Sequence, residues 1–343
     1  MVDNWLVTGG CGFIGTALIR YLIDNHLARH IRILDNLSVG TREDLATSCE
    51  FTESSPSSLV TPLSLLQVEL VNGDIRDPEI CEKCCKNMDI IVHLAANTGV
   101  PKSVENPRLD MECNVIGTFN MLEAARVHQV KRFVFASSGA PAGEVAPPIH
   151  EELPPHPVSP YGASKLAGEG YCSAYFRTFG IETVALRFSN VYGPGSSHKS
   201  SVVAKFIKQA LAGETLEIYG DGTQTRDFIY IDDLVNALVL AATKEGIGGE
   251  TFQIATSRET TLDEITELLL KVLEENGIER PKVKKTTPRQ GDVKRNFSDT
   301  TKAREILGWE SKKRLVEGIT MAIQWFISEK ERRGPGRQDR SAA

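Results

Sequence analysis

Tyr161 and Lys165 stand four residues apart, in a segment where the sequence predicts the start of a helix. Residues four apart share one face of a helix, so the two side chains are expected side by side. A lysine ammonium beside a phenol lowers the pKa of the phenol, which would let Tyr161 act as a base near neutral pH. The same spacing is common by chance on surface helices, so its meaning depends on the rest of the chain.

Two serines, Ser137 and Ser138, close a predicted buried strand over residues 132–137. In a parallel sheet, ligands bind beyond the carboxyl ends of the strands, which is where these hydroxyls are expected. A hydroxyl placed there can hydrogen-bond a reacting oxygen and relay its proton. A serine at a strand end can also simply form a turn, so Ser138 is a candidate catalytic residue because Tyr161 and Lys165 accompany it.

A glycine-rich segment lies between the first predicted strand and the first predicted helix, with Gly9 followed by Gly10-Cys11-Gly12-Phe13-Ile14-Gly15. Small residues in this Gly-x-Gly-x-x-Gly pattern let the backbone turn sharply and approach a pyrophosphate. The helix N-terminus behind them offers unpaired N–H groups and a favourable dipole. The segment therefore predicts a dinucleotide-binding site.

Asp35 ends the second predicted strand, about 20 residues after the glycine motif. A carboxylate at that point accepts hydrogen bonds from the adenosine ribose and repels the extra phosphate of NADP, which favours NAD. Arg42 lies nearby and is the residue that would suit NADP instead.

The composition of the 343-residue chain excludes several classes of protein. Hydrophobic residues make up 41% and charged residues 24%, as in a folded globular protein, and the net charge is −6. A mildly acidic chain is a poor candidate for binding nucleic acid, and no apolar run is long enough for a membrane span. The first strand begins too early to leave room for a signal peptide. The seven scattered cysteines, with Cys81, Cys84 and Cys85 on a predicted helix, suit neither a disulfide framework nor a metal site, so we expect no metal and a cytoplasmic location.

Short apolar runs alternate with helical stretches over the first 190 residues, which predicts an α/β fold with a doubly wound parallel sheet of the Rossmann type. Later segments are shorter and separated by glycine turns, which indicates a smaller C-terminal substrate-binding lobe. The chain is expected to return to the sheet over residues 228–240 and 252–254. We assign residues 1–188, with 228–255, to the NAD-binding domain and residues 189–227 and 256–328 to the lobe. Strands are expected at 5–8, 31–35, 67–71, 89–93, 132–137 and 183–188, and long helices at about 13–25, 109–128 and 161–179.

Two segments have compositions that predict mobility. Residues 47–64 are rich in Ser, Thr and Pro, and residues 329–343 are charged and then rich in Gly and Pro.

Several further segments carry a resemblance that covers residues 3–325. They are Val7–Gly15, Gly73–Asp77, His93–Ala96, Tyr161–Lys165, Arg187–Gly193, Arg226–Asp232 and Arg289–Asp292. Together they resemble the extended short-chain dehydrogenase/reductases, the NAD-dependent nucleotide-sugar epimerase/dehydratase family. Within it they resemble 4-epimerases of the UDP-galactose 4-epimerase type, acting on UDP-glucose or UDP-N-acetylglucosamine.

The resemblance implies roles for individual residues. Catalysis would fall to Ser138, Tyr161 and Lys165, and a homodimer would form through the helices at 109–128 and 161–179. The expected cofactor-binding residues are Gly9, Gly12, Phe13, Ile14, Gly15, Asp35, Asn36, Asp74, Ile75, Leu94, Ala95, Ala96, Asn114, Tyr161 and Lys165. The expected substrate-binding residues are Ser138, Asn190, Val203, Arg226, Arg289, Asp292 and Asn296.

The reaction so implied is reversible epimerisation at C4 of a UDP-sugar through a 4-keto intermediate, with NAD tightly bound. Tyr161 would take the proton of the 4-hydroxyl while hydride passes to NAD. The family's 4,6-dehydratases carry Asp-Glu directly after the serine position, where this chain has Gly139 and Ala140. UDP-glucuronate decarboxylases carry a Glu in the same stretch. A non-catalytic NAD-binding scaffold would need a decayed site, whereas the three catalytic residues are all present.

The sequence identifies the sugar of the substrate less precisely than it identifies the reaction. Family members usually carry Val-Tyr-Gly where this chain has Pro141-Ala142-Gly143, so an aromatic side chain is missing. Asn296 falls on a position that lines the sugar pocket, and it is far smaller than the tyrosine of relatives restricted to non-acetylated sugars. An N-acetyl group is therefore expected to fit. UDP-glucuronate is the alternative substrate, with Ser137, Ser138 and residues 198–201 as candidate ligands for its carboxylate.

Overall fold

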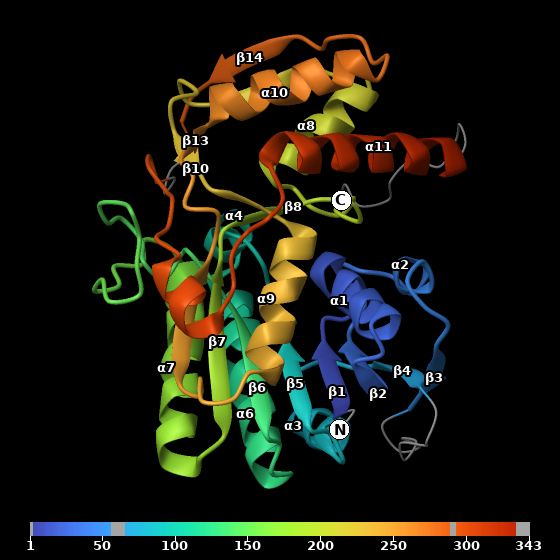
Figure 1. The fold of residues 1–343 in the computed structure, drawn as a ribbon, viewed down its shortest axis with the longest axis vertical. Coiled ribbons are helices and arrows are strands. Elements are labelled where there is room, and N and C mark those ends of the chain that lie inside the picture. The colour runs from blue at the N-terminus through green and yellow to red at the C-terminus, as the bar shows by residue number, and fades with distance from the viewer. Residues whose placement is uncertain (1–2, 56–65, 289–292, 334–343) are drawn as a thin grey trace.

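The computed structural model describes residues 3–55, 66–288 and 293–333, and it contains one large sheet of eight parallel strands (Figure 1). The order across the sheet is β12-β7-β6-β5-β1-β2-β4-β3. This arrangement confirms the predicted Rossmann-type doubly wound fold. The strands are β1 (Asp3–Thr8), β2 (Ala28–Asp35), β3 (Thr52–Ser54), β4 (Gln67–Asn72), β5 (Ile90–His93), β6 (Arg132–Ser138), β7 (Glu182–Phe188) and β12 (Glu250–Ile254).

The direction of winding reverses between β1 and β5, which are neighbours at the centre of the sheet. Successive side chains of β1 point to opposite faces: Leu6 packs in one hydrophobic cluster and Val7 in the other. Both faces are buried, which explains why the strands appear in the sequence as continuous apolar runs. A reversal of this kind leaves a crevice at the carboxyl edge of the sheet, where ligands bind in such folds.

Helices cover both faces of the sheet (Figure 1). On one face α1 (Phe13–Asp24) packs beside α9 (Ile231–Thr243). On the other, α3 (Pro78–Cys85), α6 (Gly117–Val127) and α7 (Pro160–Phe179) lie in sequence, α6 between its two neighbours.

The helix predicted over 109–128 is not uniform. It begins as α5 (Pro107–Met111), passes through a π-helical turn η1 (Glu112–Ile116) and continues as α6. Such turns insert one extra residue and occur often at functional sites. Asn114, an expected cofactor residue, lies within it. The short helices α2 (Arg42–Ala46) and α4 (Val100–Glu105) complete this half of the chain.

The segment 47–64, predicted to be mobile, contains a short strand. Residues 52–54 form β3, which pairs in parallel with β4 at the edge of the sheet. Residues 329–333, the first part of the tail predicted to be mobile, form the end of the long helix α11 (Leu315–Arg333). Within these two segments, residues 56–64 and 334–343 lie outside the described residues.

The second half of the chain builds a lobe above the carboxyl edge of the sheet (Figure 1). β12 returns to the sheet beside β7, as expected for residues 252–254, whereas residues 228–230 pair with β8 outside it. The expected return of residues 228–240 is therefore made by α9 alone. The lobe contains β8 (Asn190–Tyr192), α8 (Val202–Leu211), β9 (Leu216–Tyr219), β10 (Thr225–Arg226), β11 (Phe228–Tyr230), β13 (Thr260–Thr261), α10 (Leu262–Glu275), β14 (Val283–Thr286), the π-helical turn η2 (Ala303–Leu307) and α11.

No helix within the described ranges is both long and apolar enough to span a bilayer. The seven cysteines are free thiols, and Cys81, Cys84 and Cys85 are buried in α3 against the sheet. Burial raises the pKa of each of these three thiols. Among residues 3–55, 66–288 and 293–333, no three His, Cys, Asp or Glu side chains gather as metal ligands would.

His93 joins three elements at the end of β5. Its ring is fully buried, and its two nitrogens hydrogen-bond the hydroxyls of Thr8 at 2.8 Å and Thr118 at 3.1 Å. Burial lowers the pKa of His93 to about 3, with a smaller contribution from the positive charge of Lys165. The ring therefore links β1, β5 and α6 as a neutral group.

This neutral histidine predicts a loss of stability in acid. The unfolded chain takes up the proton near pH 6.5 and the folded chain only near pH 3, so the folded state loses stability as the pH falls between these values. We expect His93→Gln, which cannot be charged, to lose about 2 kcal/mol less than wild type between pH 7 and pH 4.5. Urea unfolding at the two pH values measures this difference. Equal losses for the two proteins would contradict it.

Candidate active site

The glycine segment forms the turn from β1 into α1. Gly9 has a φ of +68°, and a Cβ on it would stand 2.8 Å from the backbone nitrogen of Ala95 in the loop after β5. Gly12 is the N-cap of α1 and no side chain caps this end of the helix. Phe13, Ile14 and Gly15 form the first turn. The uncapped N–H groups thus face the crevice at the reversal point, where a phosphate group can accept their hydrogen bonds.

Asp35 ends β2 directly beside this turn. One carboxylate oxygen accepts a hydrogen bond from the N–H of Cys11 at 2.9 Å, and the other accepts one from Leu37 at 2.8 Å. Burial raises the pKa of Asp35, and the two backbone donors oppose that change. Arg42, the residue that would suit NADP, is instead paired with Glu53 of β3 through two hydrogen bonds of 2.7 and 3.0 Å.

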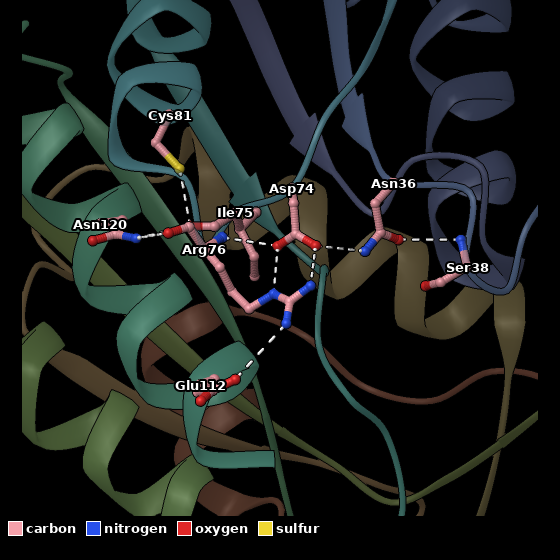
Figure 2. Close-up of polar contacts among 8 residues, drawn as sticks. All are labelled: Asn36, Ser38, Asp74, Ile75, Arg76, Cys81, Glu112 and Asn120. Carbon is pink, nitrogen blue, oxygen red and sulfur yellow. Dashed lines mark hydrogen bonds and ion pairs between the residues drawn. The ribbon is translucent and has the colours of Figure 1, made fainter. Parts of the chain in front are cut away.

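Asp74 lies in the loop after β4, where an adenine contact is expected (Figure 2). Its carboxylate accepts hydrogen bonds from the Arg76 guanidinium at 2.8 and 3.0 Å and from the Asn36 amide at 3.0 Å. These bonds, above all those from Arg76, hold the pKa of Asp74 at about 2. Arg76 also lies 3.8 Å from the carboxylate of Glu112, on the π-helical turn. The carboxylate is therefore fixed and charged at physiological pH.

Ile75 is fixed through its backbone. Its carbonyl accepts hydrogen bonds from the side-chain amide of Asn120 at 3.0 Å and from the Cys81 thiol at 3.2 Å (Figure 2). The expected adenine-binding segment is thus tied to α3 and α6.

Asn114 holds the loop that follows β5 and contains the expected contacts Leu94, Ala95 and Ala96. Its side-chain oxygen accepts a hydrogen bond from the N–H of Asn97 at 2.8 Å, and its amide nitrogen donates to the carbonyl of the same residue at 3.0 Å. The amide nitrogen also donates to Asp110 at 2.9 Å. Asn114 is buried, so its contribution to a cofactor site is to shape this loop.

The three expected catalytic residues come together where β6 ends and α7 begins. The Ser159 hydroxyl caps α7 by accepting a hydrogen bond from the N–H of Gly162 at 3.1 Å, which sets the position of Tyr161. The Lys165 ammonium lies 6.0 Å from the centre of the Tyr161 ring and donates to the Ala136 carbonyl of β6 at 2.8 Å. The Ser138 hydroxyl hydrogen-bonds the phenol and thereby lowers its pKa.

Burial nevertheless raises the pKa of Tyr161 to about 12, and the negative charge of Asp110 raises it as well. The lowered phenol pKa that the Tyr-Lys spacing predicts is therefore not produced by the chain's own residues. The physical reason is that the Lys165 ammonium is directed to a carbonyl of β6, and burial lowers its own pKa to about 8. A positive charge close to the phenol would oppose this effect of burial.

A buried ion pair between Arg187 of β7 and Glu169 of α7 holds the helix that carries Tyr161 and Lys165. Both nitrogens of the Arg187 fork donate to Glu169, at 2.9 and 2.8 Å, and the Ser137 hydroxyl donates to the same carboxylate. Sequence reasoning did not single out Glu169 or Asp110. The spacing of Glu169, four residues after Lys165 on the same helix, could have revealed it, and Asp110 stands four residues before Asn114.

The expected substrate residues lie on the lobe side of the crevice. The side chain of Asn190, at the start of β8, donates to the Asp227 carbonyl at 3.1 Å. Arg226 donates to the carbonyl of Val293 at 2.8 Å, and Arg289 and Asp292 are the other two residues expected to bind the substrate here. Those two residues lie outside the described ranges. Val203 is buried in α8.

Asn296, a residue of the lobe, lies near Gly139, the residue that follows Ser138. Its side-chain amide lies 3.9 Å from the point where a Cβ on Gly139 would stand, one residue after Ser138. Its backbone N–H donates to the Thr225 hydroxyl at 3.3 Å. Asn296 thus faces the catalytic residues across the crevice.

Comparison with known proteins agrees with this arrangement. The model of the NAD-dependent epimerase/dehydratase family matches residues 5–255. The chain belongs to that family. The UDP-glucose 4-epimerase of Mycolicibacterium smegmatis is 36% identical over 332 residues, which are 95% of this chain and 99% of the relative.

Solved structures of the epimerase/dehydratase family have the same fold. The UDP-glucose 4-epimerase of Thermotoga maritima, solved with UDP-glucose, is 36% identical, with a TM-score of 0.82 and coverage of 95% of this chain and 99% of that one. The UDP-glucose 4-epimerase of Thermus thermophilus, solved with NAD, is 34% identical, with a TM-score of 0.80 and coverage of 94% and 99%.

The residues at the reversal point fit the NAD that gives the epimerase/dehydratase family its name. The uncapped first turn of α1 suits a diphosphate. The Asp35 carboxylate, already an acceptor of two N–H groups, suits ribose hydroxyls. NAD is therefore the cofactor of this enzyme.

Proposed function

We propose that the enzyme epimerises C4 of a UDP-hexose, reversibly and through a 4-keto intermediate, with NAD tightly bound. The observation that carries the proposal is the meeting of Ser138, Tyr161 and Lys165 at the carboxyl edge of the sheet, beside the glycine turn. The relatives named UDP-glucose 4-epimerase, which align over nearly the whole chain, support the same substrate class.

Tyr161 acts as the base that takes the proton of the 4-hydroxyl and later returns it. Ser138, which already hydrogen-bonds the phenol, holds the reacting oxygen. Bound NAD would supply a hydride acceptor and a positively charged ring, and a positive charge near a phenol favours its ionised form. The Lys165 ammonium stays hydrogen-bonded to the Ala136 carbonyl, with its positive charge 6.0 Å from the centre of the Tyr161 ring.

Other reactions of the family need acids that this site lacks. Elimination of water by a 4,6-dehydratase requires an Asp-Glu pair after the serine, and here Gly139 and Ala140 occupy those positions. A decarboxylase of UDP-glucuronate would need a Glu in the same stretch. The intact group of Ser138, Tyr161 and Lys165 argues against a non-catalytic scaffold.

We assign the two halves of the site to two parts of the chain. Residues 1–188, with 228–255, bind NAD, and residues 189–227 with 256–328 hold the nucleotide sugar. Within the lobe, Asn190, Val203, Arg226, Arg289, Asp292 and Asn296 are the proposed contacts. Arginines from separate segments can clamp the diphosphate of the substrate with paired hydrogen bonds. A cytoplasmic location, proposed from the free cysteines, completes this assignment.

Replacing the proposed base tests the assignment directly. We expect Tyr161→Phe to reduce turnover by about 10²–10⁴-fold, the usual contribution of a general acid–base group, without releasing NAD. NMR of mixtures incubated with UDP-glucose, UDP-N-acetylglucosamine or UDP-glucuronate resolves the C4 epimers. Near-normal turnover in the variant, or products of elimination rather than epimers, would refute the proposal.

Asn296 is proposed to leave room for an N-acetyl group on the sugar. We expect Asn296→Tyr to suppress turnover of UDP-N-acetylglucosamine by at least about tenfold while sparing UDP-glucose, because a steric gate acts by adding a clash. Lys294→Tyr, two residues away and exposed, is the matched control. If the wild-type enzyme acts only on UDP-glucuronate, the gate proposal fails and the carboxylate alternative replaces it.

An aromatic stripe on α6 and α7, exposed at Phe119, Tyr171 and Phe179 and buried at Tyr175, is proposed to bind a second copy of the chain. Phe119, Tyr171, Tyr175 and Phe179 contact one another in series, with ring centres 5.7, 6.4 and 5.1 Å apart. Phe179 is 51% exposed. An apolar stripe of this length on paired helices suits association with its own copy across a two-fold axis, as four helices.

Sedimentation equilibrium tests the proposed dimer. We expect wild type to sediment as a dimer and Phe119→Lys as a monomer, because the lysine charge would be buried at the interface. Val283→Lys, an equally exposed apolar site on β14, should leave the dimer intact. A monomeric wild type would refute the proposal.

A further inference from the structure

The loop after β8 crosses from the lobe to the cofactor side of the crevice. The Ser196 hydroxyl donates to the Gly193 carbonyl at 2.7 Å, and the Lys208 ammonium of α8 donates to the carbonyls of Ser197 and Lys199 at 2.7 and 3.1 Å. At its far end the loop contacts α2, where the His198 ring lies 2.9 Å from a carboxylate oxygen of Asp44. These bonds fix the backbone on both sides of Lys199.

The side chain of Lys199 extends to the N-terminus of α1. Its ammonium lies 5.6 Å from the centre of the Phe13 ring, and Phe13 is the first residue of that helix. The same loop touches this ring a second time, since a Cβ on Gly195 would stand 3.5 Å from it. Lys199 therefore stands beside the uncapped turn that was built from the glycine segment.

Within the described parts of the chain, the Lys199 ammonium has no carboxylate partner, and the carboxylates of Asp35 and Asp44 already accept other hydrogen bonds. Asp44 bonds His198, and Asp35 bonds two backbone N–H groups. Burial lowers the pKa of Lys199, and no nearby charge opposes the change.

This position is unfavourable for a cation on two physical grounds. A partly buried ammonium loses hydration that only a counter-charge can replace. The N-terminus of a helix carries partial positive charge, so it repels a lysine placed beside it. An anion between the ammonium and the N–H groups of the first turn would replace the lost hydration. It would also attract both the lysine and the helix N-terminus.

We propose that Lys199 binds the diphosphate of NAD, opposite the glycine turn. Lys199 belongs to the loop after β8 in the lobe, and the glycine turn joins β1 of the sheet to α1. The diphosphate is therefore bound from both sides of the crevice. The His198–Asp44 pair and Lys208 position the loop for this contact. This role differs from the one raised above for residues 198–201, in which they would bind the carboxylate of a uronate sugar.

Binding measurements with fragments of the two ligands test the proposal. The full chain, exchanged free of carried nucleotide, is titrated calorimetrically with NAD, ADP, adenosine and UDP. We expect Lys199→Met, which keeps an apolar stem on the Phe13 ring, to weaken NAD and ADP about 10–100-fold, the usual effect of losing a hydrogen bond to a charged group. Adenosine and UDP should bind as in wild type, and Lys199→Arg should restore most of the ADP affinity.

A matched control uses the lysine of α8 whose ammonium lies over another aromatic ring. Lys205 stands 5.0 Å from the centre of the Tyr219 ring, away from the glycine turn, and Lys205→Met should change none of the four affinities. Equal losses of adenosine and ADP in Lys199→Met would show damage to the fold and overturn the proposal. A loss for UDP, a loss seen only with UDP-glucuronate, or no change with any ligand would overturn it as well.

Discussion

The buried pair of Arg187 and Glu169 is the interaction on which the catalytic group depends. It ties α7 to β7, and the hydroxyl of Ser137 extends the same network to β6. Lys165 lies about one turn and Tyr161 about two turns before Glu169 on that helix, so their positions relative to Ser138 follow from this anchor. Removing one partner of such a pair leaves an isolated buried charge, which costs about 3–5 kcal/mol. The network is a structural constraint, and its members do not touch the reacting atoms.

The cofactor side is held by a different kind of interaction. Neutral groups and backbone donors predominate there. His93 links three elements as an uncharged ring. The side-chain oxygen and nitrogen of Asn114 both hydrogen-bond the backbone of the loop after β5. The carboxylates there have local hydrogen-bond donors: Arg76 donates to Asp74, and two backbone N–H groups donate to Asp35. The Lys199 ammonium, by contrast, has no carboxylate partner among the described residues, and that is what points to an anion from outside the chain.

The sequence predicts the centre of this molecule well and its edges poorly. Strands such as β1 and β5 are buried on both faces, so each reads as an apolar run that needs no knowledge of its neighbours. The polar segment Thr52–Ser54 becomes a strand only because the exposed edge of β4 offers it partners, which no local pattern reveals. In the same way, residues 228–230 pair with β8 because the lobe brings the two together.

The site shows the same division between local and long-range information. The types and spacing of Tyr161, Lys165 and the glycines predict where it lies from local sequence alone. The protonation of Tyr161 was not predictable, because it depends on burial and on Asp110, a residue from another helix. The contact of Asn296 with the serine segment likewise depends on how the lobe closes over the sheet.

The close approach of Gly9 to Ala95 has a consequence for how such an enzyme can change. Two stretches of main chain touch there with no side chain between them, so the floor under the cofactor consists of peptide groups. Peptide groups do not titrate, and a substitution elsewhere in the chain does not alter their chemistry. New sugar specificities can therefore arise by exchanging side chains of the lobe while the hydride chemistry below stays the same, which separates what the enzyme recognises from how it reacts.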